Sequence, residues 1–285
     1  MHLREALAIS RAVGARALEG SALMALGRAA WAIDVDSRPA AAWFEDALRI
    51  LREADEPFGV GWVLIFLAGD QLKVGDLEGA ASRATEALAV GTEAELAQVV
   101  GESRRVLAIV AARKGQHADA RRLFEEAAAA HEQADDRWGL AVVLTVAAHL
   151  ASNRRDEARA LGPLRQALRL ARDTGSGERM VFAVALAAYV LHRSGRAREV
   201  ATLVGALEGV YLRIPRREEQ LRPVLLEPAG LTELEPDSGF GGLASLVSAG
   251  FESHRVAGRS LSLERAADLA LRVLDEELSL VVGTG

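Results

Sequence analysis

Apolar residues recur along most of the chain at the three- and four-residue spacing of amphipathic helices, and short polar breaks interrupt them. The segment 58–91 shows the pattern: one apolar run ends at the letters KVGD, and another begins at Leu77. Gly75 can adopt the left-handed conformation that ends a helix, and Asp76 can cap the helix that follows. The pattern therefore predicts two helices that fold back on each other as an antiparallel hairpin.

This hairpin recurs about every 40 residues. Ala-Leu or Ala-Ala pairs near the end of each expected second helix begin at residues 47, 87, 127 and 167. The breaks keep the same interval at Gly75, Gly115 and Gly195, and Arg155 stands where a fourth glycine is expected. Self-similarity at such a period is typical of solenoids, in which each repeat buries its apolar face against the next. We therefore predict an all-α solenoid of antiparallel helix pairs over residues 1–211.

The residue pattern of these pairs resembles the tetratricopeptide repeat. In the segment 58–91 the signature positions are occupied by Leu64, Leu67, Ala68, Gly75, Ala80, Ala84 and Ala87. The resemblance implies a right-handed superhelix of helix pairs. The period of 40 residues exceeds the usual tetratricopeptide period of about 34. We expect the additional residues between the second helix of one pair and the first helix of the next, as in the letters AVGTEAELAQ, and therefore longer helices than in the standard repeat. Pairs of the armadillo or HEAT type, with periods of about 40 to 47, remain the alternative.

The regular pattern stops after Tyr211. Four prolines follow, at Pro215, Pro223, Pro228 and Pro236, and proline at this density prevents a continuous helix. Residues 212–239 are therefore expected to form an irregular connector. Residues 240–285 are expected to form two capping helices, the second starting at Ser262, which cover the last apolar face of the array.

The C-terminal end resembles the ending of the helical-repeat region in bacterial LuxR-type transcriptional regulators and related signal-transduction ATPases. The matching positions are Phe251, Gly258, Arg259, Ser260, Leu261, Ser262, Leu263, Glu264 and Ala266. The family usually has a carboxylate where this chain has Arg265, so only Glu264 remains to complement the helix dipole. The resemblance implies the sensor or scaffold arm of a larger regulator. Since the sequence contains neither an ATP-binding G-x-x-x-x-G-K-[ST] loop nor a DNA-reading domain, we expect a fragment or a split reading frame.

Composition narrows the possible partners. The net charge of −6 does not favour binding to nucleic acid, and the absence of cysteine excludes disulfides and thiolate chemistry. The longest apolar run, residues 180–191, is too short for a membrane span of about 20 residues, and the N-terminus has no signal-peptide stretch. We expect a cytoplasmic protein that contacts neither nucleic acid nor membrane.

No catalytic apparatus is evident in the sequence. The six histidines include no pair at helical ligand spacing, and no serine lies in a G-x-S-x-G motif. The glycine-containing letters GSG at 175 and SGFGG at 238 lack the strand-then-helix setting of phosphate loops. We therefore predict no catalytic residue, no metal and no cofactor, and a protein that is not an enzyme.

The concave groove is the better functional candidate. Projecting the 40-residue step onto the first helices predicts three rows: Trp62, Glu102, Val142 and Phe182; Gly69, Ile109, His149 and Tyr189; Lys73, Arg113, Asn153 and Arg193. The third row is mostly basic and could bind an acidic peptide or an anionic effector. The competing interpretation is structural, because cations are favoured near helix C-termini and aromatic residues pack in cores.

Two functions fit these patterns. The first is a non-enzymatic scaffold whose groove binds a protein or peptide partner within bacterial signalling or transcriptional control. The alternative is a sensor domain that binds a small-molecule effector in the concave groove and shifts an equilibrium of its parent regulator. An open polar groove would favour the scaffold, whereas an enclosed pocket with aromatic walls would favour the sensor.

Overall fold

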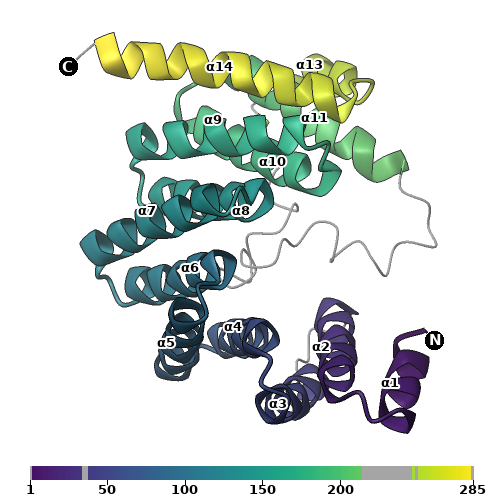
Figure 1. Cartoon of the computed structure of the whole chain (residues 1–285). Coiled ribbons are helices and arrows are strands. Elements are labelled where there is room, and N and C mark those ends of the chain that lie inside the picture. Colours follow the sequence, from purple (N-terminus) through teal and green to yellow (C-terminus); the bar gives the residue numbers. More distant parts are fainter. Residues whose placement is uncertain (1, 34–37, 214–245, 248–249, 284–285) are drawn as a thin grey trace. The chain divides into compact units, whose positions relative to one another are not determined.

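The computed structural model describes residues 2–33, 38–213, 246–247 and 250–283, and their regular secondary structure is helical (Figure 1). The chain divides into two compact units, residues 1–139 and 140–285. Most of the predicted connector, from residue 214 to 239, lies outside the described residues. Within the described part of the chain, no helix is both long enough and apolar enough to cross a membrane.

The helices follow one another with short connectors. The first unit contains α1 (His2–Ala12), α2 (Arg16–Ile33), α3 (Arg38–Glu53), α4 (Pro57–Lys73), α5 (Leu77–Glu93), α6 (Ala97–Arg113) and α7 (His117–Gln133). The boundary between the units falls within α8 (Arg137–Asn153). The second unit continues with α9 (Glu157–Asp173), α10 (Gly177–Arg193), α11 (Ala197–Arg213), α13 (Glu252–Gly258) and α14 (Leu263–Gly283). The prediction of an all-α array of paired antiparallel helices is confirmed.

The helices α4 to α11 have identical lengths and spacing. Each has 17 residues, and the starts of successive helices in this set are 20 residues apart. The 40-residue period therefore consists of two equal halves, each made of a helix and a three-residue connector. The expectation that the additional residues lie between pairs was wrong. Both kinds of connector are equally short, and the excess over the tetratricopeptide period lengthens the helices, so the expectation of longer helices is confirmed.

One backbone geometry serves every connector from α3 to α11. The middle residue of each is left-handed, and these residues are Asp55, Gly75, Glu95, Gly115, Asp135, Arg155, Gly175 and Gly195. At Gly75, its N–H donates to the Leu72 carbonyl, and the Asp76 N–H donates to the Gln71 carbonyl. This is the Schellman arrangement, which satisfies the last carbonyls of a helix. The Asp76 carboxylate then accepts a hydrogen bond from Gly79 N at 2.9 Å, so one connector ends a helix and caps the next, as predicted.

In the first unit, α2, α4 and α6 are the first helices of their pairs. They pack against α3, α5 and α7 respectively, and α4 also contacts both α2 and α6. Glycines allow the close approach of helices both within and between pairs. A Cβ atom at Gly20 or Gly59 would lie within 3 Å of Leu51, and one at Gly61 would lie 2.5 Å from Val99. A single large side chain thus fills each of these junctions.

In the second unit, α14 packs against α9, α10 and α11 and closes the core. It begins at Leu263, and the Ser262 hydroxyl accepts a hydrogen bond from Arg265 N, which confirms the predicted helix start. The helix α13 crosses α11 at very short range: a Cβ atom at Gly205 would lie 1.9 Å from the main-chain oxygen of Arg255. The Glu208 carboxylate binds both Arg255 and Arg259, which fixes this crossing.

Candidate functional site

The nine predicted groove residues lie on first helices, but they divide between the two units. The first unit contains Trp62 and Lys73 on α4 and Glu102 and Arg113 on α6. The second unit contains His149 and Asn153 on α8 and Phe182, Tyr189 and Arg193 on α10. Each group is therefore a separate candidate surface, and binding by these residues stays a prediction.

Trp62 belongs to an aromatic stripe along α4. Its ring lies 6.2 Å from the ring of Phe58 and 5.8 Å from that of Phe66, one helical turn to either side. Phe66 also stacks on Phe44 of α3 at 5.3 Å, and the Arg28 guanidinium lies over it at 5.5 Å. Phe44 is wholly buried, whereas Phe58 is 44% exposed. The stripe therefore passes from the core of the first unit to its surface.

Glu102 lies in the interior of the first unit and not on an open surface. It is 4% exposed, and its carboxylate accepts a hydrogen bond from Arg105 Nε at 2.8 Å. The other carboxylate oxygen is 3.5 Å from Nε2 of His131, on α7. Burial raises the pKa of Glu102, but Arg105 and His131 outweigh it and bring the pKa to about 2. Glu102 therefore stabilises a buried charge network and is not available to a partner.

His131 is the centre of that network. Its ring is fully buried, with Nδ1 3.0 Å from the Asp136 carboxylate, and a Cβ atom at Gly101 or Gly139 would collide with it. Burial lowers the pKa of His131, but Glu102 and Asp136 together outweigh burial, so the net shift is upward. The imidazole thus fills a junction between pairs, as Leu51 does two junctions earlier along the chain, but it does so with a polar ring in place of an apolar side chain.

The arginines of the predicted basic row bind main-chain carbonyls. Arg113 donates to the Leu72 carbonyl at 2.6 Å, and Arg193 donates to the Ser152 carbonyl at 2.7 Å. Arg193 also reaches the Ser152 hydroxyl and lies 3.2 Å from Glu157. Each arginine therefore satisfies the last turn of the preceding first helix, which is the structural role that the helix-dipole argument favours.

Three predicted residues come together in the second unit. Asn153 Nδ2 is 3.0 Å from His149 Nε2, and the charge of Arg193 acts on the same imidazole. Burial, and then Arg193, lower the pKa of His149 to about 4, so the ring is neutral at pH 7. Phe182 and Tyr189 are half-buried, and burial raises the pKa of the Tyr189 hydroxyl. This group is polar but carries no arrangement of acid, base and nucleophile.

Sequence reasoning did not find His131, Asp136 or the exposed Phe58. The glycines at positions 101 and 139 were the only indication that a bulky side chain packs between their helices. This indication can be interpreted only when the pairing of the helices is known. Among the described residues, no group of three or more histidines, aspartates or glutamates could hold a metal ion.

No protein-family model matches the chain, and no curated protein or solved structure is significantly similar to it. The likeness to tetratricopeptide repeats and to LuxR-type regulators therefore depends on the residue patterns alone. The architecture itself is that of helical-repeat scaffolds: antiparallel helix pairs stacked on their neighbours along the chain.

Proposed function

We propose that the chain is a non-enzymatic scaffold that binds a protein partner through the first helices of its first unit. The observation that carries this proposal is the aromatic stripe of α4, which reaches the surface at Phe58. Large aromatic side chains supply contact area at a low cost in conformational entropy, and they dominate the energetics of many protein interfaces. The stripe supplies an apolar anchor for a peptide, next to the polar surfaces of the connectors.

Selection of peptides from a displayed library against the immobilised chain tests this function. Selected peptides should bind wild type, and Phe58→Ser should weaken their binding at least tenfold by calorimetry. Val74→Ser is the matched control, because Val74 is also an exposed apolar residue but lies in the connector after α4. Peptides that bind the Phe58→Ser variant as well as wild type would contradict the role of the stripe.

A small-molecule effector is the second candidate, and one observation favours it. The indole N–H of Trp62 is buried and finds no acceptor among the described residues. A buried donor without an acceptor costs about 1–3 kcal/mol, which a ligand oxygen could recover. In a thermal-shift screen of aromatic amides and carboxylates, the shift should be lost in Trp62→Phe, since phenylalanine keeps an aromatic ring but has no donor.

We further propose that this scaffold is the sensor or scaffold arm of a bacterial transcriptional regulator or signalling ATPase. The C-terminal motif supports the proposal, because its residues have packing roles: Gly258 admits the Thr202 carbonyl, and Arg259 binds Glu208. A P-loop ATPase encoded next to this reading frame should then co-purify with the chain. Failure of the two proteins to associate when co-expressed would count against this assignment.

A further inference from the structure

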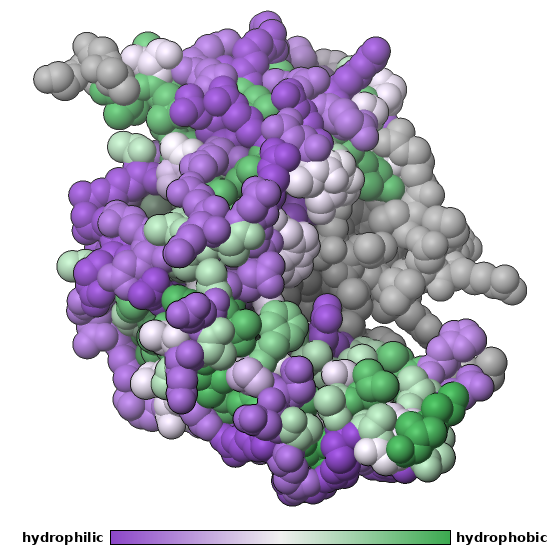
Figure 2. Space-filling view, viewed as in Figure 1, coloured by the Kyte–Doolittle hydropathy of each residue, from purple (hydrophilic) through white to green (hydrophobic). Residues whose placement is uncertain are grey.

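Two large aromatic side chains are exposed at the starts of first helices in the first unit. Phe58 and Trp138 are each the second residue of their helix, α4 and α8, and they are 44% and 51% exposed. Hydrophilic residues make up most of the surface in Figure 2, and apolar residues form separate green patches in it. Exposed aromatic rings are preferred anchors of protein interfaces. The charges next to the two rings decide which kind of partner fits there.

The connectors that lead into the first helices lie along one edge of the unit. They are residues 54–56, 94–96 and 134–136. Val99 of α6 lies against Gly61, near the start of α4. His131 lies against Gly101 and Gly139, near the starts of α6 and α8. The starts of α4, α6 and α8 therefore follow one another along this edge, together with their connectors.

Most acidic residues on or beside these connectors have no partner in the described part of the chain. We call six of them the acidic edge: Asp55, Glu56, Glu93, Glu95, Glu132 and Asp135. All but Glu56 are exposed, and Glu56 precedes α4 without making a capping hydrogen bond. Glu93 and Glu132 lie in the last turns of α5 and α7, where the helix dipole disfavours a negative charge. Stability therefore does not account for these charges.

The connectors of the opposite edge, residues 74–76 and 114–116, use their carboxylates within the unit. Asp76 caps α5 through Gly79 N. Glu78, in the first turn of α5, binds Lys114 at 2.6 Å. Negative charge without a partner is therefore a property of one edge and not of connectors in general.

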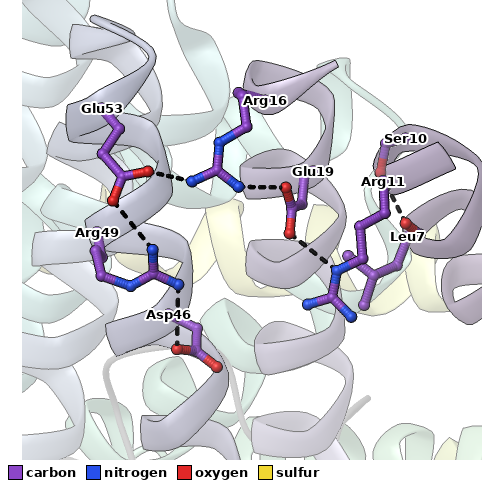
Figure 3. A network of polar contacts seen from close by, with 8 residues as sticks. All are labelled: Leu7, Ser10, Arg11, Arg16, Glu19, Asp46, Arg49 and Glu53. Atoms are coloured by element: carbon purple, nitrogen blue, oxygen red, sulfur yellow. Dashed lines mark hydrogen bonds and ion pairs between the residues drawn. The ribbon is translucent and has the colours of Figure 1, made fainter. Parts of the chain in front are cut away.

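Two carboxylates next to the acidic edge show the same contrast at closer range. Asp136 lies 3.0 Å from Nδ1 of His131. Figure 3 shows Glu53, the last residue of α3, bound by both Arg16 and Arg49. The chain thus supplies cations to carboxylates beside the acidic edge and leaves the acidic edge itself to bind cations from outside.

We propose that the partner of the aromatic stripe is a basic, extended segment of another protein, which crosses the starts of α4, α6 and α8 along the acidic edge. This inference rests on the proposed function, because Phe58 supplies the anchor. Arginines of the segment bind the carboxylates and stack on the exposed rings, as Arg28 lies over the ring of Phe66 at 5.5 Å. Successive first helices lie about 8–10 Å apart, so about seven extended residues span the three starts.

The probe for the test is a fluorescein-labelled peptide of about ten residues that alternates arginine with leucine, and its counterpart has glutamate at every arginine position. Fluorescence anisotropy with the full chain should give a Kd on the order of 10–100 µM for the basic peptide, because a flexible segment must be ordered on binding. The acidic peptide should bind at least tenfold more weakly. Joint replacement by Asp55→Asn, Glu95→Gln and Asp135→Asn should weaken binding of the basic peptide at least tenfold, since these changes remove charge and keep side-chain size.

A second triple variant controls for total charge. Glu5→Gln, Asp119→Asn and Glu125→Gln together also remove three negative charges, but from exposed positions of α1 and α7 away from the acidic edge. This variant should bind the basic peptide within twofold of wild type. Circular dichroism should show the same helicity in both triple variants. An equal loss of binding in the two variants would overturn the inference, because total charge would then govern the binding.

The results separate this inference from the proposed function. Equal binding of the two peptides, or equal binding by wild type and the acidic-edge variant, would overturn the basic partner. Peptides selected from the displayed library could still depend on Phe58, whatever their charge, and the anchor would then stand. Self-association in sedimentation equilibrium that the acidic-edge variant abolishes would also overturn the inference, because the edge would then bind a second copy of this chain.

Discussion

The Arg113 guanidinium donates a hydrogen bond of 2.6 Å to the main-chain carbonyl of Leu72. Leu72 lies one repeat earlier in the sequence. The contact between Arg193 and the Ser152 carbonyl has the same separation of 41 residues. The array thus uses a side chain at the end of one first helix to satisfy the end of the previous first helix. Two members of the basic row predicted from the sequence, Arg113 and Arg193, therefore connect successive helix pairs.

Arg113→Gln should destabilise the first unit by about 1–2 kcal/mol, because the Leu72 carbonyl loses a charged donor. Urea unfolding followed by circular dichroism measures the change. Arg122→Gln is the matched control. Arg122 is an exposed residue that pairs with Asp119 and Glu126 on its own helix, and surface pairs of this kind contribute little to stability. Equal stability of Arg113→Gln and wild type would show that the contact carries no net energy.

Joint charge reversal at Lys73, Arg113 and Arg193 is expected to lower stability as well as any ligand binding, because Arg113 and Arg193 bind main-chain carbonyls.

His149 should make the second unit less stable in acid. The folded pKa of about 4 lies below the unfolded value of about 6.5, so the unfolded chain binds the proton first as the pH falls. The contribution of His149 to the free energy of unfolding is therefore complete above about pH 6.5 and decreases toward pH 4. The decrease between about pH 7 and pH 5 is about 1–2 kcal/mol. Thermal unfolding of wild type and His149→Phe over this range checks it, and parallel pH profiles would contradict the buried neutral imidazole.

His131 should show the opposite sign. Its folded pKa is raised, so its contribution to stability is complete below the unfolded value of about 6.5 and is lost as the pH rises through the folded pKa. Relative to His131→Gln, wild type should therefore lose stability on the alkaline side of neutrality. The difference between the two unfolding free energies, measured from about pH 6 to pH 9, isolates this histidine. An advantage of wild type that grows with pH would show that the ring is not held as the cation.

The sequence was sufficient for the hairpins but not for the equality of their connectors. Gly75 and Asp76 are residue types that end and begin helices, and both were assigned correctly. Glu95 carries no such signal, although it has the same left-handed backbone, so the connector around it was placed in a longer loop. The His131 network was missed for a different reason, because its members come from two helices and a connector whose packing is defined only after the pairs assemble.

Gly205→Ala should destabilise the second unit by about 1–3 kcal/mol, since the new methyl group would lie 1.9 Å from a main-chain oxygen of α13 that cannot move without the helix. Gly177→Ala is the control, because nothing lies within 4 Å of a Cβ atom at that position and alanine favours helices. Thermal unfolding should separate the two variants clearly. A neutral Gly205→Ala would mean that α13 does not pack this closely on α11.

Replacing Arg155 or Glu95 by glycine should stabilise the fold, against the usual trend for helix-rich proteins. Both residues have a positive φ, at 59° and 56°, where a non-glycine side chain costs about 1–2 kcal/mol. Glycine avoids that cost but gives up about 0.5–1 kcal/mol of chain entropy on folding, so the expected net gain is about 0.5–1 kcal/mol for each.

Gly115→Ala tests the same argument in the other direction. Gly115 has the corresponding conformation, with φ of 77° and open space around its Cα, so alanine there brings strain without a steric clash and should lower stability by a comparable amount. Chemical denaturation of the three variants measures the opposite signs. A loss of stability in Arg155→Gly would mean that the side chain contributes contacts worth more than the strain of its backbone, and the left-handed connectors would then not be interchangeable along the array.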